Sequence, residues 1–134
     1  MVNQLHCDAL GKLVVRLTVG ALMMFHGIAK ILHPGSLEFI GNSLAGAGLP
    51  ALLAYGVYVG EIIAPLMVLA GFYARIGGLI IVVNMIFAVM LAHTGDFFSL
   101  TQHGGWAIEL QAFYLLGGLA VVLLGSGKFA VKPD

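Results

Sequence analysis

Six ionisable side chains lie inside otherwise apolar stretches of this sequence: Arg16, His26, Lys30, Glu61, His93 and Glu109. An ionisable group in an apolar segment is costly unless it is paired or hydrated, so each one is a candidate for function. Imidazole and amine groups can donate hydrogen bonds to a ligand oxygen, and a nearby carboxylate can take up or release protons. The set is therefore suited to holding a polar ligand group and exchanging protons with it.

A metal site is the alternative chemistry for the same residues. Two imidazoles and two carboxylates, from His26, His93, Glu61 and Glu109, have donor types that suit Zn, Fe or Mn. Carboxylate metal centres in helical bundles place Glu-x-x-His on one helix, however, and neither glutamate has a His three residues later. Cys7 is the only cysteine, which excludes a multi-thiolate site within the chain. We therefore expect no metal.

The elements that carry these residues are long apolar segments. Of the 134 residues, 60% are hydrophobic and 9% are charged, whereas soluble domains have about 25% charged residues. A membrane-spanning helix needs roughly 20 apolar residues. Four segments of about that length, at 13–31, 51–72, 76–93 and 105–124, predict an all-α fold. We expect a polytopic membrane four-helix bundle, a single domain over residues 1–134, with a short interfacial helix over 37–44.

Composition and motifs exclude several classes of function. Basic and acidic residues are equal in number, six of each, so there is no excess positive charge to neutralise nucleic-acid phosphates. The sequence contains neither the GxxxxGK[ST] phosphate-binding loop nor the HExxH metalloprotease motif. Because four spans use most of the chain, we expect no separate soluble catalytic domain and recognise no complete catalytic centre.

The basic residues outside the spans predict the orientation in the membrane. Lys12, Arg75, Lys128 and Lys132 flank the spans on one side, and Lys30 lies on the other. Positive charge is retained on the cytoplasmic side of membrane proteins. Both termini are therefore predicted to be cytoplasmic.

Helical spacing predicts how the spans pack. In the first span, Arg16 and Lys30 share a face with Gly20 and Gly27, and small residues allow helices to approach closely. The second span has a GxxxG ridge, Gly56, Gly60 and Ala64, beside Glu61. We expect this ridge to contact the first span. Arg16, Arg75 and Asn84 are assigned structural roles.

Depth along the helices places five candidate ligand-binding residues in the outer half of the bundle: His26, Lys30, Glu61, His93 and Glu109. Together they predict a polar pocket floored by Glu61. At mid-membrane Glu61 should be neutral or paired, so we expect it within about 4 Å of a basic side chain of the first span. Lys30 and His26 can approach it, and Arg16 is the alternative if the second span sits higher. Simpler explanations exist: Lys30 and His93 can reach water at the interface, and Glu109 can hydrogen-bond His26.

The sequence resembles the DoxX family of bacterial membrane proteins. The resemblance is carried by RLTVGALMMFHGIAKI at 16–31, by GEIIAPLMVLAGFYARIGGLI at 60–80 and by the final helix with Glu109 followed by GSGKFAV. It implies a four-helix protein of the bacterial inner (plasma) membrane, related to subunits of quinone-linked redox or sulfur-oxidation complexes and to oxidative-stress partners. The polar positions that match are Arg16, His26, Gly27, Lys30, Glu61, Arg75, His93 and Glu109.

Three hypotheses for function follow. The first is a redox-complex subunit that binds a quinone, with His26 and His93 as hydrogen-bond donors and Glu61 and Glu109 as proton relays. The second is a non-catalytic membrane partner in a redox or stress-response complex. The third is a small oligomeric transporter or proton-conducting protein. The partners expected are the lipid bilayer, other complex subunits and further copies of the chain.

Overall fold

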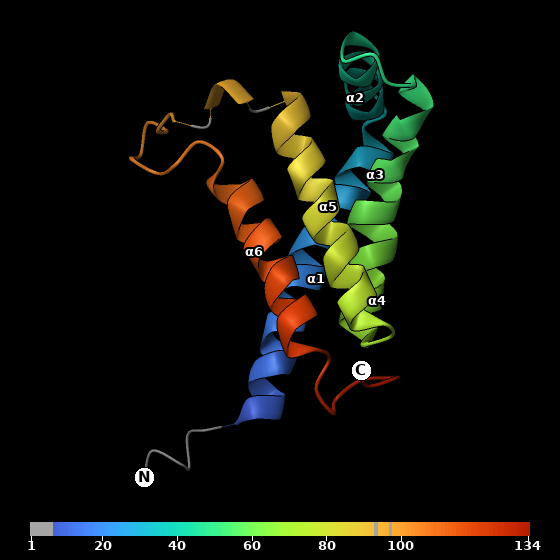
Figure 1. The fold of residues 1–134 in the computed structure, drawn as a ribbon, viewed down its shortest axis with the longest axis vertical. Helices are drawn as coiled ribbons and strands as arrows, with labels where there is room; N and C mark the ends of the chain where they lie inside the picture. Colours follow the sequence, from blue (N-terminus) through green and yellow to red (C-terminus); the bar gives the residue numbers. More distant parts are fainter. Residues whose placement is uncertain (1–6, 93, 97) are drawn as a thin grey trace.

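The computed structural model describes residues 7–92, 94–96 and 98–134, and within these residues the regular structure is helical, with no strand (Figure 1). The elements are α1 (Asp8–Leu32), α2 (Gly35–Gly46), η2 (Ala51–Tyr55), α3 (Gly56–Tyr58), η3 (Val59–Ile63), α4 (Ala64–Ala70), α5 (Ala74–Ala92), η4 (Thr94–Asp96) and α6 (Glu109–Leu124).

The predicted membrane bundle is confirmed. Three helical stretches in the described part of the chain are long and apolar enough to cross a membrane: α1, the run from η2 to α4, and α5. The fourth, α6, is apolar but has 16 residues. It begins at Glu109 rather than at 105, because the preceding residues form a tight turn. Gly104 there has a φ of 84°, and the Gly105 backbone N–H donates to the Thr101 hydroxyl.

The second span is not one uniform helix. It begins as a 3-10 turn, continues as α3, widens into the π-helical turn η3 and ends as α4. Pro65 accounts for the widening, because proline has no N–H to donate and its ring would clash with the carbonyl four residues earlier, that of Glu61. The widened turn precedes this proline, and its Ala64 N–H reaches back to the Val59 carbonyl. Glu61 therefore lies in the middle of a π-helical turn.

Helices α1, α4, α5 and α6 pack around one apolar core. Its buried members include Met23 of α1, Val68 of α4, Ile81 of α5 and Val121 of α6. Many large apolar side chains point outward instead, with Phe113 of α6 63% exposed. That arrangement is expected of a bundle whose outer surface faces lipid.

The glycines correct one packing prediction. The face of α1 that carries Gly20 and Gly27 turns into the bundle, and there it meets the second span near Pro65 and Glu61. The GxxxG ridge of the second span does not face α1, however. Gly60 contacts Asn84 of α5, and Gly56 has open space beside it. Gly20 and Gly27 already allow α1 and the second span to approach closely, so the GxxxG ridge packs toward α5 instead.

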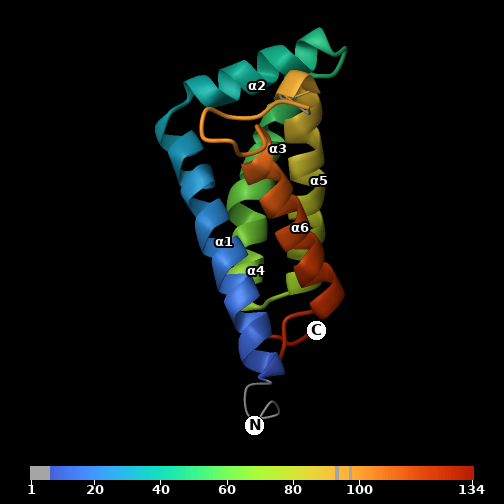
Figure 2. The same ribbon diagram turned by 90° about the vertical axis from the view of Figure 1, so that its left-hand side faces the viewer.

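The two ends of the bundle differ in their connections. Figure 2 shows α2 lying across one end, while the start of α1 and the C-terminal residues lie at the other. The predicted short helix over 37–44 is thus confirmed in a longer form, Gly35–Gly46.

Candidate functional site

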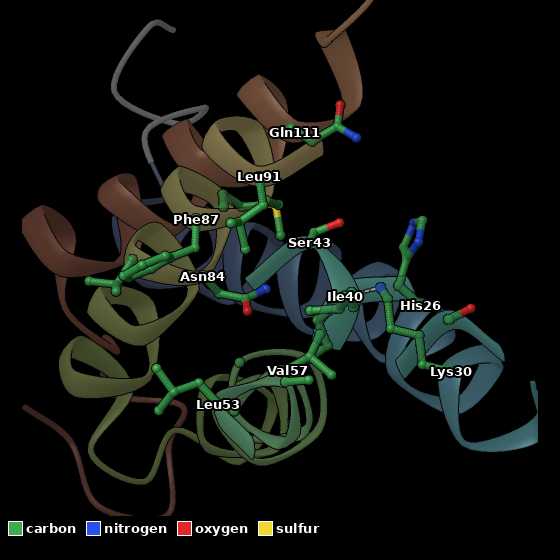
Figure 3. Close-up of a pocket in the computed structure, with 18 of the residues that line it drawn as sticks. His26, Lys30, Ile40, Ser43, Leu53, Val57, Asn84, Phe87, Leu91 and Gln111 are labelled. Carbon is green, nitrogen blue, oxygen red and sulfur yellow. Dashed lines mark hydrogen bonds and ion pairs between the residues drawn. The ribbon is translucent and has the colours of Figure 1, made fainter. Parts of the chain in front are cut away.

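A cavity of about 740 Å³ lies beneath α2. Its wall comes from α1, α2, the second span, α5 and α6, and most of it is apolar, as with Val57, Phe87 and Leu91 (Figure 3). Eight polar or ionisable side chains are also part of the lining: His26, Lys30, Ser36, Ser43, Glu61, Asn84, Gln111 and Tyr114. A concave, mainly apolar site with a few converging polar groups is the usual form of a small-molecule site.

An ion pair forms the charged part of this wall. Lys30 Nζ lies 2.5 Å from Glu61 Oε1. The Glu61 side chain is 4% exposed and the Lys30 side chain is 24% exposed, so the amine is the more accessible partner. The prediction that Glu61 pairs with a basic side chain of the first span is confirmed, and that side chain is Lys30 rather than Arg16.

The local sequence explains why these two groups meet. A methyl group at Gly27 would overlap the backbone carbonyl of Glu61, so only glycine lets α1 approach the η3 turn this closely. Lys30 follows Gly27 by three residues and so lies on the same side of α1. π-helical turns are frequent at functional sites. The HGxxK segment of α1 and the GExxxP segment of the second span thus build one contact.

The other predicted ligand residues separate into two groups. His26 lines the cavity, and its ring packs edge-on against Tyr114 with 5.4 Å between the ring centroids. Glu109 does not line the cavity and is exposed at the start of α6. His93 lies outside the described residues. Of the five predicted residues, His26, Lys30 and Glu61 thus line one cavity, and Glu109 lies outside its lining.

Asn84, for which the sequence predicts a structural role, packs over Gly60 and also lines the cavity. Sequence reasoning also missed Tyr114, Gln111 and Ser43 as lining residues. Gln111 and Tyr114 are three residues apart on α6, which is a signal that they share a face. Ser43 carried no such signal, because the position of α2 depends on the connection that turns it over the bundle.

Arg16 and Arg75 lie in the opposite half and bind backbone. The Arg16 guanidinium is 1% exposed and donates to the carbonyls of Val68, Leu69, Ser126 and Phe129. Arg75 donates through a side-chain N–H to the Val122 carbonyl and through its backbone N–H to Asp134. These contacts join α1, the second span, α5, α6 and the C-terminal segment. Both arginines thus bind the backbone of neighbouring segments in this half of the bundle.

One protein family and two bacterial proteins match this sequence. The DoxX family model matches residues 11–94. A protein of Bacillus subtilis (strain 168) named "Putative oxidoreductase CatD" is 29% identical over 92% of this chain and 86% of its own length. An uncharacterized protein of Haemophilus influenzae (strain ATCC 51907 / DSM 11121 / KW20 / Rd) is 31% identical over 87% of this chain and 84% of its own. No solved structure matches.

Proposed function

Because the chain belongs to the DoxX family, we propose that it binds a quinone-like ligand in the cavity beneath α2, as a subunit or partner of a membrane redox or stress-response complex. It would act in the bacterial inner membrane as a single domain over residues 1–134. The observation that carries the proposal is the Lys30–Glu61 pair in the wall of a mainly apolar cavity of about 740 Å³.

The cavity offers what a quinone head group needs. A quinone is a flat apolar ring with two carbonyl oxygens that accept hydrogen bonds. An ammonium has three N–H donors, and Glu61 accepts one from Lys30, which leaves donors for a ligand oxygen. The Asn84 amide supplies a second donor, and apolar side chains such as Phe87 and Val57 can cover the ring faces.

The ion pair also supports an exchange of protons. A quinone oxygen takes up a proton when the ring is reduced, and a positioned acid or amine can deliver it. Lys30 holds such a proton at the cavity wall, and Glu61 stabilises the charged amine. We assign the binding and proton-exchange role to this chain and the supply of electrons to its partner subunits. The Bacillus subtilis relative is named a putative oxidoreductase, which is in keeping with a redox setting.

Equilibrium binding tests this proposal. The purified protein in lipid nanodiscs is titrated with decylubiquinone, a short-chain quinone, and we expect saturable binding. Lys30→Met should weaken it by about tenfold or more, because a hydrogen bond to a charged group is lost. Glu109→Gln is the matched control, since that acid is outside the cavity, and it should bind like the parent. Absence of saturable binding by the folded protein, or undiminished binding by Lys30→Met, would refute the proposal.

The orientation is tested separately. In a Cys7→Ser background, single cysteines at Thr101 and at Lys128 report on opposite ends of the bundle, and both positions are exposed. We expect a membrane-impermeant thiol reagent to label position 101 in intact spheroplasts and position 128 only after lysis. Labelling of position 128 before lysis would place the termini outside.

A further inference from the structure

The end of the bundle away from the cavity carries most of the positive charge. All twelve Asp, Glu, Lys and Arg residues lie in the described part of the chain. This end has Lys12, Arg16, Arg75, Lys128 and Lys132, whereas Glu38, Glu61, Asp96 and Glu109 lie toward the α2 end. Its two acids are already engaged, because Asp8 pairs with Lys12 at 2.8 Å and Asp134 accepts from backbone N–H groups. The end therefore has a net positive charge.

The C-terminal segment holds one of these cations in a defined place. The backbone N–H of Val131 donates to the Ala70 carbonyl, and that of Lys132 donates to the Gly71 carbonyl. The segment is thereby fixed against the connection between α4 and α5. Lys132 Nζ then lies 2.6 Å from the Tyr73 hydroxyl and 4.3 Å from the centre of that ring. Among the described residues, no carboxylate forms an ion pair with Lys132.

A shallow, open apolar groove lies along the outer face of α4, beside the same segment. It has a volume of about 470 Å³ and is lined by Ile63, Leu66, Met67, Ala70, Phe72 and Val131. From Ile63 to Ala70 the groove extends about 10 Å along the helix at 1.5 Å per residue. The ring centroid of Phe72, which lines the groove, lies 4.6 Å from that of Tyr73, which contacts Lys132, so the apolar groove and this cation are adjacent.

We propose that this groove and cation form a binding site for an anionic phospholipid. One acyl chain would lie along α4, and the headgroup phosphate would accept hydrogen bonds from Lys132 and from the Tyr73 hydroxyl. The tyrosine can do so because its oxygen accepts from Lys132 while its own proton stays available. Tyrosine and lysine are both favoured at the level of the headgroups, and basic residues there attract anionic lipids. Charge complementarity and the length of the groove together favour a lipid over a soluble anion.

The experiment compares lipids and matched variants of the full chain in detergent. Binding of phosphatidylglycerol and phosphatidylcholine with the same dioleoyl chains is measured by native mass spectrometry, together with the shift in melting temperature. We expect phosphatidylglycerol to bind more tightly. Lys132→Gln should weaken its binding by about fivefold, the effect of one basic residue near an anionic lipid. Lys128→Gln removes the same charge from the same segment, away from the groove, and should bind like the parent.

Three further measurements make the outcome decisive. Dihexanoyl phosphatidylglycerol and inorganic phosphate, which cannot fill the groove, should bind more weakly than the dioleoyl lipid. Lys132→Arg, which keeps the charge, should retain the preference and shows that the segment still folds. Equal binding of the two dioleoyl lipids, an equal loss in the Lys132 and Lys128 variants, or an equal effect of free phosphate would overturn the proposal.

Discussion

Two basic side chains of α1 point into the bundle, and their surroundings differ. Arg16 is surrounded by the backbone, and its guanidinium donates to four carbonyls with 1% of the residue exposed. Lys30 bonds to the Glu61 carboxylate and lines a cavity of about 740 Å³. Both charges are stabilised, but only Lys30 lies in the wall of a cavity, where its remaining donors have open volume beside them. A buried charge that adjoins open volume can still reach other molecules, whereas a buried charge enclosed by backbone holds together the segments around it.

The largest expected effect on stability comes from substitution of Arg16. Arg16→Met removes all four hydrogen bonds and leaves buried carbonyls without donors, so we expect the free energy of unfolding to fall by about 4 kcal/mol or more. Arg16→Lys should recover part of the loss, because an ammonium keeps the charge but has fewer donors. Denaturation of the purified protein followed by circular dichroism measures both. A melting temperature unchanged in Arg16→Met would remove the distinction between the two cations.

The Lys30–Glu61 pair should respond differently, because its two members depend on each other. Lys30→Met leaves a buried carboxylate without a cation and should cost about 3 kcal/mol of stability. The double replacement Lys30→Met with Glu61→Leu should be milder, since it removes both charges. Unfolding of the two variants is compared directly with that of the parent. If the double variant is no more stable than Lys30→Met alone, the loss of stability in Lys30→Met does not come from the unpaired Glu61 carboxylate.

The close approach that brings Lys30 to Glu61 depends on Gly27. Gly27→Ala places a methyl group against the Glu61 carbonyl and should lower stability by about 1 to 3 kcal/mol. Gly11→Ala is the matched control in the same helix, where nothing lies within 4 Å of the new methyl group. That change should stabilise by about 0.5 to 1 kcal/mol, because alanine favours the helix. Equal effects of the two substitutions would contradict the packing described for Gly27.

The smallest effect is expected at Glu109. This acid is exposed and outside the cavity lining, so Glu109→Gln should change the free energy of unfolding by less than about 0.5 kcal/mol. Thermal unfolding measures it in the same preparation as the other variants. A large fall in the free energy of unfolding would show that Glu109 stabilises the start of α6, in addition to the contacts made by Arg16 and Lys30.

Much of the fold could be predicted from the sequence because a bilayer imposes strong rules on composition. Apolar segments of span length predicted the helices, and the glycines of α1 predicted the face that packs against the second span. The pairing of Glu61 was also predictable, since a carboxylate at that depth needs a cation or a proton. Each of these inferences uses spacing along a single helix, which the sequence states directly.

The remaining features depend on how separate helices meet. Spacing favoured Lys30 and His26 over Arg16 as the partner of Glu61 but could not choose between these two, and the preference itself depended on the relative height of the second span. It could not place Asn84 or Tyr114 in the cavity, since an uncharged polar residue has no strong rule that assigns it a neighbour. Nor could it show that α2 closes over one end while Arg16 binds the C-terminal segment at the other. The sequence by itself thus determined that charges within the apolar spans, such as Arg16 and Glu61, needed partners. Only the tertiary structure decided which partners they took and where space remained for a ligand, because those depend on contacts between residues far apart in the chain.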